Sequence, residues 1–583
     1  MIKKLLSSVR EYKKSTLLTP VYVVFEALIE ILIPTLMAYL IDYGIDGKNM
    51  PYVLQIGLAL VAAAMVSLLV GYLAGRSAAV AASGFAKNLR RDMFYNVQGF
   101  SFSNIDKFST GSIITRLTTD VTNVQMAYQM LIRLGIRAPV MIVFALAFSF
   151  RIDAHLSLIF LIIIPVLGAG LLLIMSHVHP IFVRVFNTYD KLNNVVQENL
   201  SGIRVVKSYI REDFEERKFA GISQSIFDDF TKAEKRLAFN MPMMQFCLYA
   251  CMILLSWFGA KEIVASGNNP ALGLSTGGLT SLITYAMQIL MSLMMLSMVF
   301  VMILISRASA ERIVEVLDEK SDLKNKADPV REVRDGSVEF ENVTFSYSRK
   351  ADKPVLDKIS LFIRSGETVG ILGGTGSSKS SLVQLIPRLY DVVSGRVLVG
   401  GVDVRDYDLT ALRNQVAMVL QKNILFSGTV KDNLRWGDEN ATGEEMVRAC
   451  RLAQADGFIR EFPAGYDTHI EQGGTNVSGG QKQRLCIARA LLKKPKILIL
   501  DDSTSAVDTK TDGLIRQALR DEIPDTTKIV IAQRVASVQD ADKIVVLDDG
   551  RIDAVGTHEE LLRTCDIYRE VYESQTRGGA LHE

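Results

Sequence analysis

Two adjacent carboxylates, Asp501 and Asp502, follow a short apolar run and are the first candidates for chemistry in this sequence. The run Ile497–Leu500 has the character of a strand that is buried on both faces, as in parallel sheets. Open α/β sheets place their ligand-binding groups at the carboxyl ends of such strands. The pair therefore predicts a metal site, provided that a phosphate-binding loop lies elsewhere in the same domain.

A glycine-rich loop of that kind lies upstream. Val369–Leu372 is a predicted strand, the segment GGTGSSKSS follows it directly, and a helix is predicted after that. Glycines let backbone N–H groups surround phosphates, and the helix N-terminus adds the positive end of a dipole. Lys379 would reach the β- and γ-phosphates, and Ser380 would bind Mg²⁺. The predicted nucleotide-binding residues of this P-loop are Gly373, Gly374, Thr375, Gly376, Ser377, Ser378, Lys379, Ser380 and Ser381.

The P-loop departs from its usual pattern at Ser378, where a glycine normally precedes the lysine. A Cβ atom at this position crowds the turn or demands a strained backbone, because glycine alone adopts left-handed conformations without cost. We therefore expect strain at Ser378 and a reduced affinity for nucleotide.

Further motifs follow in the order typical of the ABC transporter superfamily, which this chain resembles over nearly its whole length. In that family an aromatic residue stacks on adenine, and Tyr347 in VTFSYS resembles it. Gln421 resembles the Q-loop glutamine, which contacts Mg²⁺ and senses the coupling helices, and Asp501 resembles the Mg²⁺-binding aspartate. The resemblance implies that the domain binds ATP and Mg²⁺.

The segment NVSGGQKQR resembles the ABC signature motif, whose glycine-rich helix N-terminus grips a nucleotide held by the other domain of a dimer. Glu471 resembles the acid of the exporter X-loop, and Ser505–Asp508 resembles the D-loop, with Asp508 as its acid. The signature residues that the resemblance assigns to the partner's nucleotide are Ser478, Gly479, Gly480 and Gln481.

Two further departures concern catalysis. Where the family has a glutamate that acts as general base or positions water, this chain has Asp502, and where it has the switch histidine, this chain has Gln533. The missing methylene draws the carboxylate back by roughly 1.5 Å, and a misplacement near 1 Å can cost about 10²-fold in rate. Glutamine donates a hydrogen bond but carries neither a transferable proton nor a positive charge.

These departures surround the γ-phosphate of this chain's own nucleotide, whereas the signature motif that serves the partner is intact. The asymmetry resembles the degenerate-site subunit of bacterial heterodimeric multidrug ABC exporters, in which one composite site hydrolyses ATP and the other mostly holds it. The alternative is an active homodimer that tolerates Asp502 and Gln533.

Composition separates the two halves of the chain. Hydrophobic residues make up 49% of the 583 residues and charged residues 22%, with the apolar excess in the first half, and the formal net charge is +2. This balance gives no reason to expect nucleic acid as a partner. The five cysteines have no paired-motif spacing, so we expect buried thiols rather than disulfides or a zinc site.

Six apolar segments are each long enough to cross a bilayer, which takes about 20 helical residues. They lie at roughly 17–42, 53–75, 129–150, 155–177, 241–265 and 278–306. Before them, residues 1–14 place apolar side chains on one helical face and basic residues around it, which predicts an interfacial helix on an anionic leaflet. A signal peptide is the competing interpretation, but the apolar segment that follows is too long.

Two long polar connections, after the second and fourth spans, are rich in lysine and arginine, which predicts that they and both termini lie in the cytoplasm. Their helical period predicts that the spans continue well beyond the membrane. The stretches 102–120 and 198–215 resemble the two intracellular loops of ABC exporters, which in that family end in coupling helices that dock on the nucleotide-binding domains.

Charged residues inside the spans are costly and therefore informative. Glu26 and Glu30 lie one turn apart on the first span, and Arg133 and Arg137 lie one turn apart on the third, at similar depth. We expect the two pairs to bind each other or to face a substrate cavity, although Arg133 alone would also reach the interface by snorkelling.

A methionine stripe on the sixth span favours a surface for varied apolar substrates, with helix packing as the alternative. Its members are Met287, Met291, Met294, Met298 and Met302.

The predicted fold is an all-α transmembrane domain of six long helices followed by an α/β P-loop domain. The expected boundaries are an interfacial helix at 1–14, the transmembrane domain at 15–320, a linker at 321–336, the nucleotide-binding domain at 337–575 and a polar tail at 576–583. The resemblance implies one half of a dimeric, ATP-driven exporter in the cytoplasmic membrane, whose partner is a second half-transporter and whose cargo is hydrophobic or amphipathic. Alternatives from other classes are a nucleotide-gated channel and a regulatory ATP-binding subunit.

Overall fold

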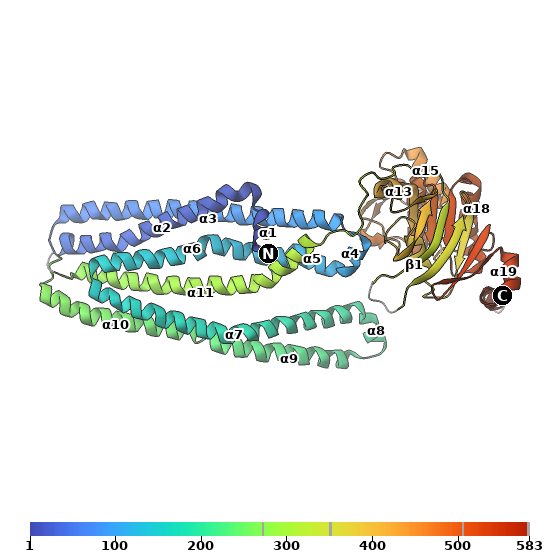
Figure 1. The fold of residues 1–583 in the computed structure, drawn as a ribbon. Coiled ribbons are helices and arrows are strands. Elements are labelled where there is room, and N and C mark those ends of the chain that lie inside the picture. Colours follow the sequence, from blue (N-terminus) through green and yellow to red (C-terminus); the bar gives the residue numbers. More distant parts are fainter. Residues whose placement is uncertain (271–272, 349–352, 504–505, 580–583) are drawn as a thin grey trace. The chain divides into compact units, whose positions relative to one another are not determined.

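The computed structural model describes residues 1–270, 273–348, 353–503 and 506–579. The chain divides into two compact units, of which the first comprises Met1–Gln98 with Thr110–Glu319 and the second Gly99–Ser109 with Lys320–Glu583. Figure 1 shows long helices in the first unit and a mixture of strands and shorter helices in the second.

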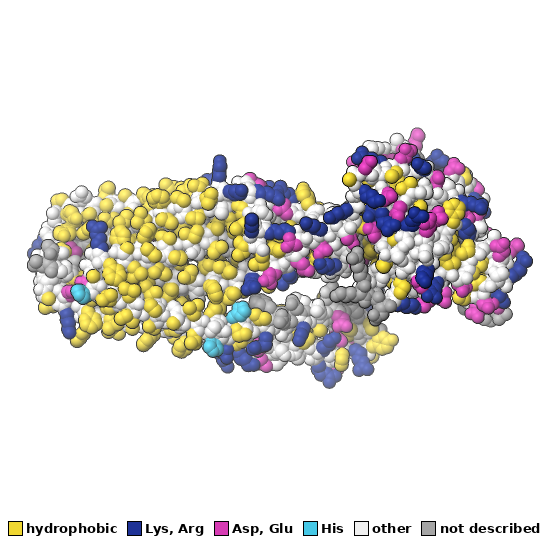
Figure 2. All heavy atoms as spheres, viewed as in Figure 1, with side chains coloured by type: hydrophobic (Ala, Val, Ile, Leu, Met, Phe, Trp, Pro, Cys, Tyr) yellow, Lys and Arg dark blue, Asp and Glu magenta, His cyan; other side chains and the backbone are white. Residues whose placement is uncertain are grey.

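The first unit is all helical. Its helices are α1 (Ile2–Ser7), α2 (Lys13–Tyr39), α3 (Met50–Gln98), α5 (Thr110–Thr115), α6 (Val121–Ile152), α7 (Ala154–Ser201), α8 (Ile203–Ser208), α9 (Glu212–Leu237), α10 (Asn240–Ser266) and α11 (Thr276–Asp318). Among the described residues, six helical segments are long and apolar enough to cross a membrane, which confirms the six predicted spans. Figure 2 shows apolar side chains over much of the visible face of these helices.

Several of these helices are much longer than a membrane is thick. Helix α3 has 49 residues, which at a rise of about 1.5 Å per residue is more than twice the roughly 30 Å hydrocarbon core of a bilayer. Helix α7 has 48 residues. The predicted continuation of the spans into long helical connections is confirmed.

The N-terminal helix is shorter than the stretch 1–14 that the pattern predicts. Helix α1 ends at Ser7 and α2 begins at Lys13. Between them Arg10 has a left-handed backbone with φ of 40°, and the Asn88 side chain donates a hydrogen bond of 2.9 Å to the carbonyl of Ser8. The chain therefore bends onto α3 and buries Leu5 and Val9, while Ile2 stays exposed.

The second unit contains two main sheets. Its helices are α4 (Phe102–Lys107), α12 (Lys379–Gln384), α13 (Leu409–Gln415), α14 (Val430–Arg435), α15 (Gly443–Leu452), α16 (Asp456–Glu461), α17 (Gly479–Leu492), α18 (Thr509–Glu522), α19 (His558–Thr564) and α20 (Asp566–Gly579). Its strands are β1 (Val338–Phe345), β2 (Leu356–Ile363), β3 (Thr368–Leu372), β4 (Ser394–Val399), β5 (Val402–Asp403), β6 (Val416–Val419), β7 (Gly428–Thr429), β8 (His469–Ile470), β9 (Ile497–Asp501), β10 (Thr527–Ile531), β11 (Lys543–Asp548) and β12 (Arg551–Gly556).

The central sheet has the strand order β12-β11-β3-β10-β9-β6, and a four-stranded antiparallel sheet has the order β2-β1-β4-β5. Strands β11, β3, β10, β9 and β6 are parallel, as predicted for this domain. Ile531 at the end of β10 lies opposite Ile371 of β3 and Asp501 of β9. The carboxyl ends of three adjacent strands thus meet at one edge, where the predicted nucleotide residues follow them.

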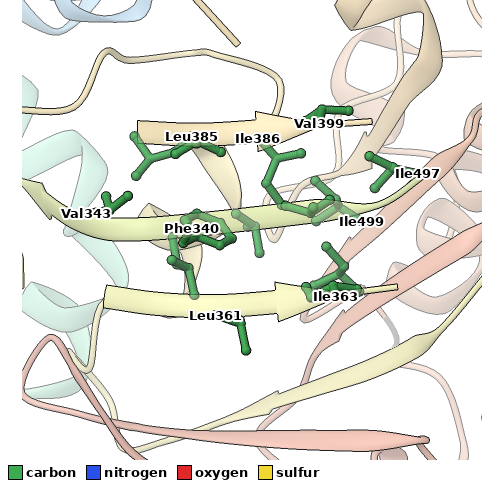
Figure 3. Packing of buried hydrophobic residues seen from close by; sticks show 14 of the residues in the cluster. Phe340, Val343, Leu361, Ile363, Leu385, Ile386, Val399, Ile497 and Ile499 are labelled. Carbon is green, nitrogen blue, oxygen red and sulfur yellow. The ribbon is translucent and has the colours of Figure 1, made fainter. Parts of the chain in front are cut away.

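A hydrophobic core between the two sheets holds this edge in place (Figure 3). Phe340 from the antiparallel sheet, Ile499 from β9 and Ile386 just after α12 all belong to it. Full burial of such a side chain contributes about 1.5–3 kcal/mol to stability. The core therefore holds the helix that follows the P-loop in position. The five cysteines are free and buried, as predicted.

Candidate functional site

The P-loop connects β3 to α12 and closes around the amine of Lys379. Its Nζ donates hydrogen bonds to the carbonyls of Gly373 at 2.7 Å and Gly374 at 2.8 Å, and to Ser377 Oγ at 3.2 Å. A Cβ atom on Gly373 would lie 2.2 Å from the carbonyl oxygen of Leu547, so only glycine fits there. The loop thus holds a cation at the centre of a turn that opens a helix, which suits phosphate.

Ser378 has the strained backbone that is expected when a residue with a side chain stands where the P-loop usually has glycine. It lies in the left-handed region with φ of 70° and ψ of 23°, immediately before Lys379 begins α12. A non-glycine residue in this region costs roughly 1–2 kcal/mol. The loop keeps its shape in spite of this cost, because the core beneath α12 and the bonds of Lys379 hold both of its ends.

Asp501 lies at the end of β9, buried, and accepts a hydrogen bond of 3.0 Å from Ser380 Oγ. Burial raises the pKa of the Asp501 carboxyl, and the Asp502 carboxylate adds to this, whereas Ser380 and Lys379 lower it. Burial also lowers the pKa of the Lys379 amine. Two oxygen ligands of the kind that Mg²⁺ prefers therefore already face each other beside a phosphate-binding loop, and the residues present fit this ion.

Asp502 is the point at which three predicted residues meet. Its Oδ2 accepts a hydrogen bond of 3.0 Å from Gln533 Nε2 and a longer one of 3.5 Å from Gln421 Nε2. The backbone N–H of Asp502 donates to the carbonyl of Ile531 at 3.0 Å, which ties the end of β9 to the end of β10. The three side chains converge at the carboxyl edge of the sheet.

Tyr347 contacts the P-loop helix α12. Its hydroxyl shares a hydrogen bond of 2.8 Å with Ser381 Oγ and donates to Gln384 Oε1 at 3.3 Å. The side chain is 49% exposed, so part of its ring remains open to a planar ligand.

The signature residues begin α17 with a reciprocal cap. Ser478 Oγ accepts from the backbone N–H of Gln481 at 3.3 Å, and the Gln481 side chain accepts from the N–H of Ser478 at 2.9 Å. Gly480 packs closely on the following loop, since a Cβ there would lie 2.8 Å from the carbonyl of Ala506. The cap leaves Gly479 exposed at the helix N-terminus, a position suited to an anion.

The predicted D-loop is described in part. Ser505 lies outside the described residues, whereas Asp508 caps α18 by accepting from the N–H of Thr511 at 2.9 Å. These backbone and side-chain contacts with Thr511 lower the pKa of Asp508. Glu471 of the predicted X-loop accepts a hydrogen bond of 2.9 Å from Thr475 Oγ1.

Comparison with known proteins places this geometry in a family. The models for the ABC transporter transmembrane region and for the ABC transporter domain match residues 16–293 and 356–505. The ATP-binding protein YfiB, an ABC transporter of Bacillus subtilis, is 35% identical over 98% of this chain and 98% of its own. The chain belongs to the ABC transporter family.

Two further relatives refine the assignment. The ATP-dependent lipid A-core flippase of Desulfotalea psychrophila is 33% identical over 84% of this chain and 84% of its own length. A bacterial Atm1-family ABC exporter solved with ATP bound has a TM-score of 0.83 and 25% identity, covering 97% of this chain and 99% of that one. The protein is an ABC exporter half-transporter, a multi-pass membrane protein that hydrolyses ATP with Mg²⁺ and functions as a dimer.

The transmembrane unit of this ABC exporter contains an ion cluster. Arg137 donates to Glu26 Oε1 at 2.9 Å and to Glu30 through 2.7 and 2.8 Å bonds, so one guanidinium bridges both carboxylates. Gly71 on α3 makes room for the cluster, since a Cβ there would lie 3.0 Å from Glu26 Oε1.

Arg133 departs from the expectation of two pairs. Its Nε is buried without a hydrogen-bond partner among the described residues, and its guanidinium lies next to Gly75 of α3, 3.6 Å from where a Cβ atom would be.

The methionines of α11 do not share one environment within the single chain. Met287, Met291 and Met298 are exposed, whereas Met294 and Met302 are half-buried. An exposed stripe is compatible both with a substrate surface and with packing against the second half of the dimer.

Sequence reasoning missed the contacts of Tyr390. Its hydroxyl donates to Asp106 of α4 at 2.7 Å, and its ring lies 5.1 Å from that of Tyr347. The signal available in the sequence was an aromatic residue at the end of the predicted P-loop helix, which periodicity alone assigns to the core.

Proposed function

We propose that this chain is the degenerate-site half of a heterodimeric ABC exporter that moves hydrophobic or amphipathic compounds out across the cytoplasmic membrane. The observation that carries the proposal is the environment of Asp502. Its short carboxylate accepts hydrogen bonds from Gln533 at 3.0 Å and Gln421 at 3.5 Å, where the family has a longer carboxylate and a histidine.

This environment supports slow hydrolysis at the chain's own site. A general base needs a free lone pair about 2.6–3.2 Å from the heavy atom whose proton it removes. Oδ2 of Asp502 accepts from two side-chain amides, so one of its two carboxylate oxygens is occupied by donors that cannot take up a proton. Gln533 likewise supplies neither the proton nor the positive charge of an imidazole.

The same site retains what ATP binding requires. Lys379 would exchange its bonds to the carbonyls of Gly373 and Gly374 for phosphate oxygens, and Ser380 and Asp501 would hold Mg²⁺. The ion held by these two residues would supply positive charge that offsets the charge of the phosphates. Tyr347 would stack on adenine. ATP thus binds here and holds the two halves together.

Turnover would occur mainly at the other composite site, built from the partner's P-loop and this chain's signature residues. The capped, exposed N-terminus of α17 supports this role, because Gly479 and Gly480 present backbone N–H groups without side chains. In-line attack of water on the γ-phosphate would then depend on the partner's general base and on Ser478 of this chain.

For the transported compound we propose a cavity that includes Glu26, Glu30 and Arg137 together with Met287, Met291, Met294 and Met298. Flexible thioethers adapt to varied apolar shapes, and the name of the lipid A-core flippase supports an amphipathic cargo. The basic residues of the long connections support a cytoplasmic location for both termini and for the ATP-binding domain. Concentrative efflux into vesicles separates an exporter from a nucleotide-gated channel.

The proposal predicts slow ATP hydrolysis when the chain is purified alone. We expect its ATP turnover to be about 10²-fold below that of the assembled transporter, given the displaced carboxylate. The double variant Asp502→Glu with Gln533→His is expected to raise turnover of the lone chain by at least about tenfold. Steady-state phosphate release in detergent and in nanodiscs measures both.

A matched control is the same pair of variants combined with Lys379→Ala, which removes the phosphate-binding amine and should return turnover to the background. Full activity of the unaltered lone chain would instead assign it to an active homodimer.

A further inference from the structure

Four aromatic rings form a continuous cluster between α4 and the P-loop helix, all within the second unit. The ring of Tyr390 lies 6.0 Å from Phe102 of α4, 5.6 Å from Phe345 and 5.1 Å from Tyr347, and it meets Tyr347 nearly edge to face at 86°. Phe345 in turn lies 4.9 Å from Tyr347. Edge-to-face pairs at these separations attract each other and fix relative ring orientation.

Polar bonds hold both ends of this cluster. At one end the hydroxyl of Tyr390 donates to Asp106 Oδ2 at 2.7 Å. Burial and the Asp106 carboxylate raise the pKa of Tyr390, so the phenol stays protonated and remains the donor. At the other end the hydroxyl of Tyr347 bonds to Ser381 Oγ at 2.8 Å, on the first turn of the P-loop helix. The cluster therefore reaches from α4 to the P-loop.

Other polar contacts of α4 go to the linker. Ser103 Oγ donates to Asp322 at 2.7 Å, and Asn104 Nδ2 donates to the carbonyl of Lys320 at 3.2 Å. These bonds hold α4 near the start of the second unit. Tyr390 contacts both α4 and the ring of Tyr347, so it connects the two.

We propose that Tyr390 is a positioning residue that links docking of α4 to ATP binding, by setting the orientation of the Tyr347 ring through ring contacts and the position of α4 through Asp106. The inference rests on the proposed stacking of Tyr347 on adenine. ATP that orders Tyr347 thereby stabilises the contact of Tyr390 with α4. Because such linkage is reciprocal, loosening α4 weakens ATP binding by the same factor.

The variant Tyr390→Phe tests the link because it keeps every ring contact and removes only the hydroxyl that binds Asp106. In full-length protein in nanodiscs, with Mg²⁺ chelated to prevent hydrolysis, ATP should slow hydrogen exchange of the α4 amides in the unaltered chain. We expect Tyr390→Phe to remove most of this slowing and to weaken ATP binding about fivefold, the lower end of usual couplings. Wild-type behaviour in either measurement would overturn the link, since reciprocity requires both changes.

Two control variants separate positioning from general stability. Asp106→Asn keeps an oxygen acceptor for the Tyr390 hydroxyl and should behave almost like the unaltered chain, whereas Asp106→Ala should match Tyr390→Phe and add nothing to it in the double variant. Tyr466→Phe removes an equivalent hydroxyl, which donates to Asp456 at 2.8 Å, and should leave ATP binding and α4 exchange unchanged. A similar loss of ATP affinity in Tyr466→Phe would reduce the effect to destabilisation and overturn the proposal.

The variant Tyr347→Ala tests the adenine role separately. Weakened ATP binding in Tyr347→Ala, together with wild-type behaviour of Tyr390→Phe, overturns the link alone. Unchanged ATP binding in Tyr347→Ala removes the stacking role and with it the foundation of the inference.

Discussion

Ser478→Arg in this chain is expected to lower ATP turnover of the assembled transporter by at least about 10²-fold, the usual cost of losing one preorganised donor to a developing oxyanion. Ser478 stands at the exposed N-terminus of α17, next to Gly479 and Gly480. An arginine side chain there would occupy the space in which the partner's phosphate is expected. Steady-state phosphate release from the co-purified complex measures the effect.

The control for this variant is Thr442→Arg. Thr442 caps α15 with the same reciprocal arrangement, in which its Oγ1 accepts from the N–H of Glu445 at 3.2 Å. Both variants lose a cap worth about 1 kcal/mol, but Thr442 is not among the residues assigned to nucleotide. Thr442→Arg should therefore retain turnover. Equal losses in the two variants would remove the signature role and leave only a stability effect.

Arg137→Met is expected to destabilise the transmembrane unit strongly. It leaves Glu26 and Glu30 without the guanidinium that binds both, and their side chains are only 8% and 26% exposed. Removing one partner of a buried ion pair costs about 3–5 kcal/mol. The yield of folded protein after heating in detergent, followed by size-exclusion chromatography, reports the loss.

Arg133→Met is the matched control for that change, because Arg133 lies one turn away on the same helix and forms no ion pair among the described residues. It should be tolerated or slightly stabilising. Adding Glu26→Gln and Glu30→Gln to Arg137→Met should restore much of the stability, since the unpaired charges disappear. If Arg137→Met proved as stable as Arg133→Met, the bridge would not hold α2 to α6.

The parts of the site that depend on local sequence were predictable. The strand before Asp501, the P-loop before Lys379 and the capped start of the signature helix each carry their pattern within about ten residues. The strain at Ser378 also followed from the residue type, because a side chain stands where the turn requires a left-handed backbone.

The parts that depend on distant contacts were not predictable from local patterns. Arg133 and Arg137 are chemically identical and lie one turn apart, so the sequence does not distinguish them. In the folded unit Arg137 reaches the two glutamates, whereas Arg133 lies against Gly75 of α3. Tyr390 and Asp106 are 284 positions apart, so no local period reveals their bond. The N-terminal helix ends at Ser7, next to the carbonyl of Ser8 that accepts a hydrogen bond from Asn88, far along the chain.

Asp502→Asn in the assembled transporter tests the division of labour between the two sites most directly. The measurement is steady-state ATP hydrolysis, compared with that of the unaltered complex prepared in parallel. If this chain's own site mainly holds ATP, turnover should fall by no more than about twofold, far less than the 10²-fold or more expected of a catalytic base. Loss of turnover by about 10²-fold or more would show that Asp502 is catalytic and would contradict the proposed asymmetry.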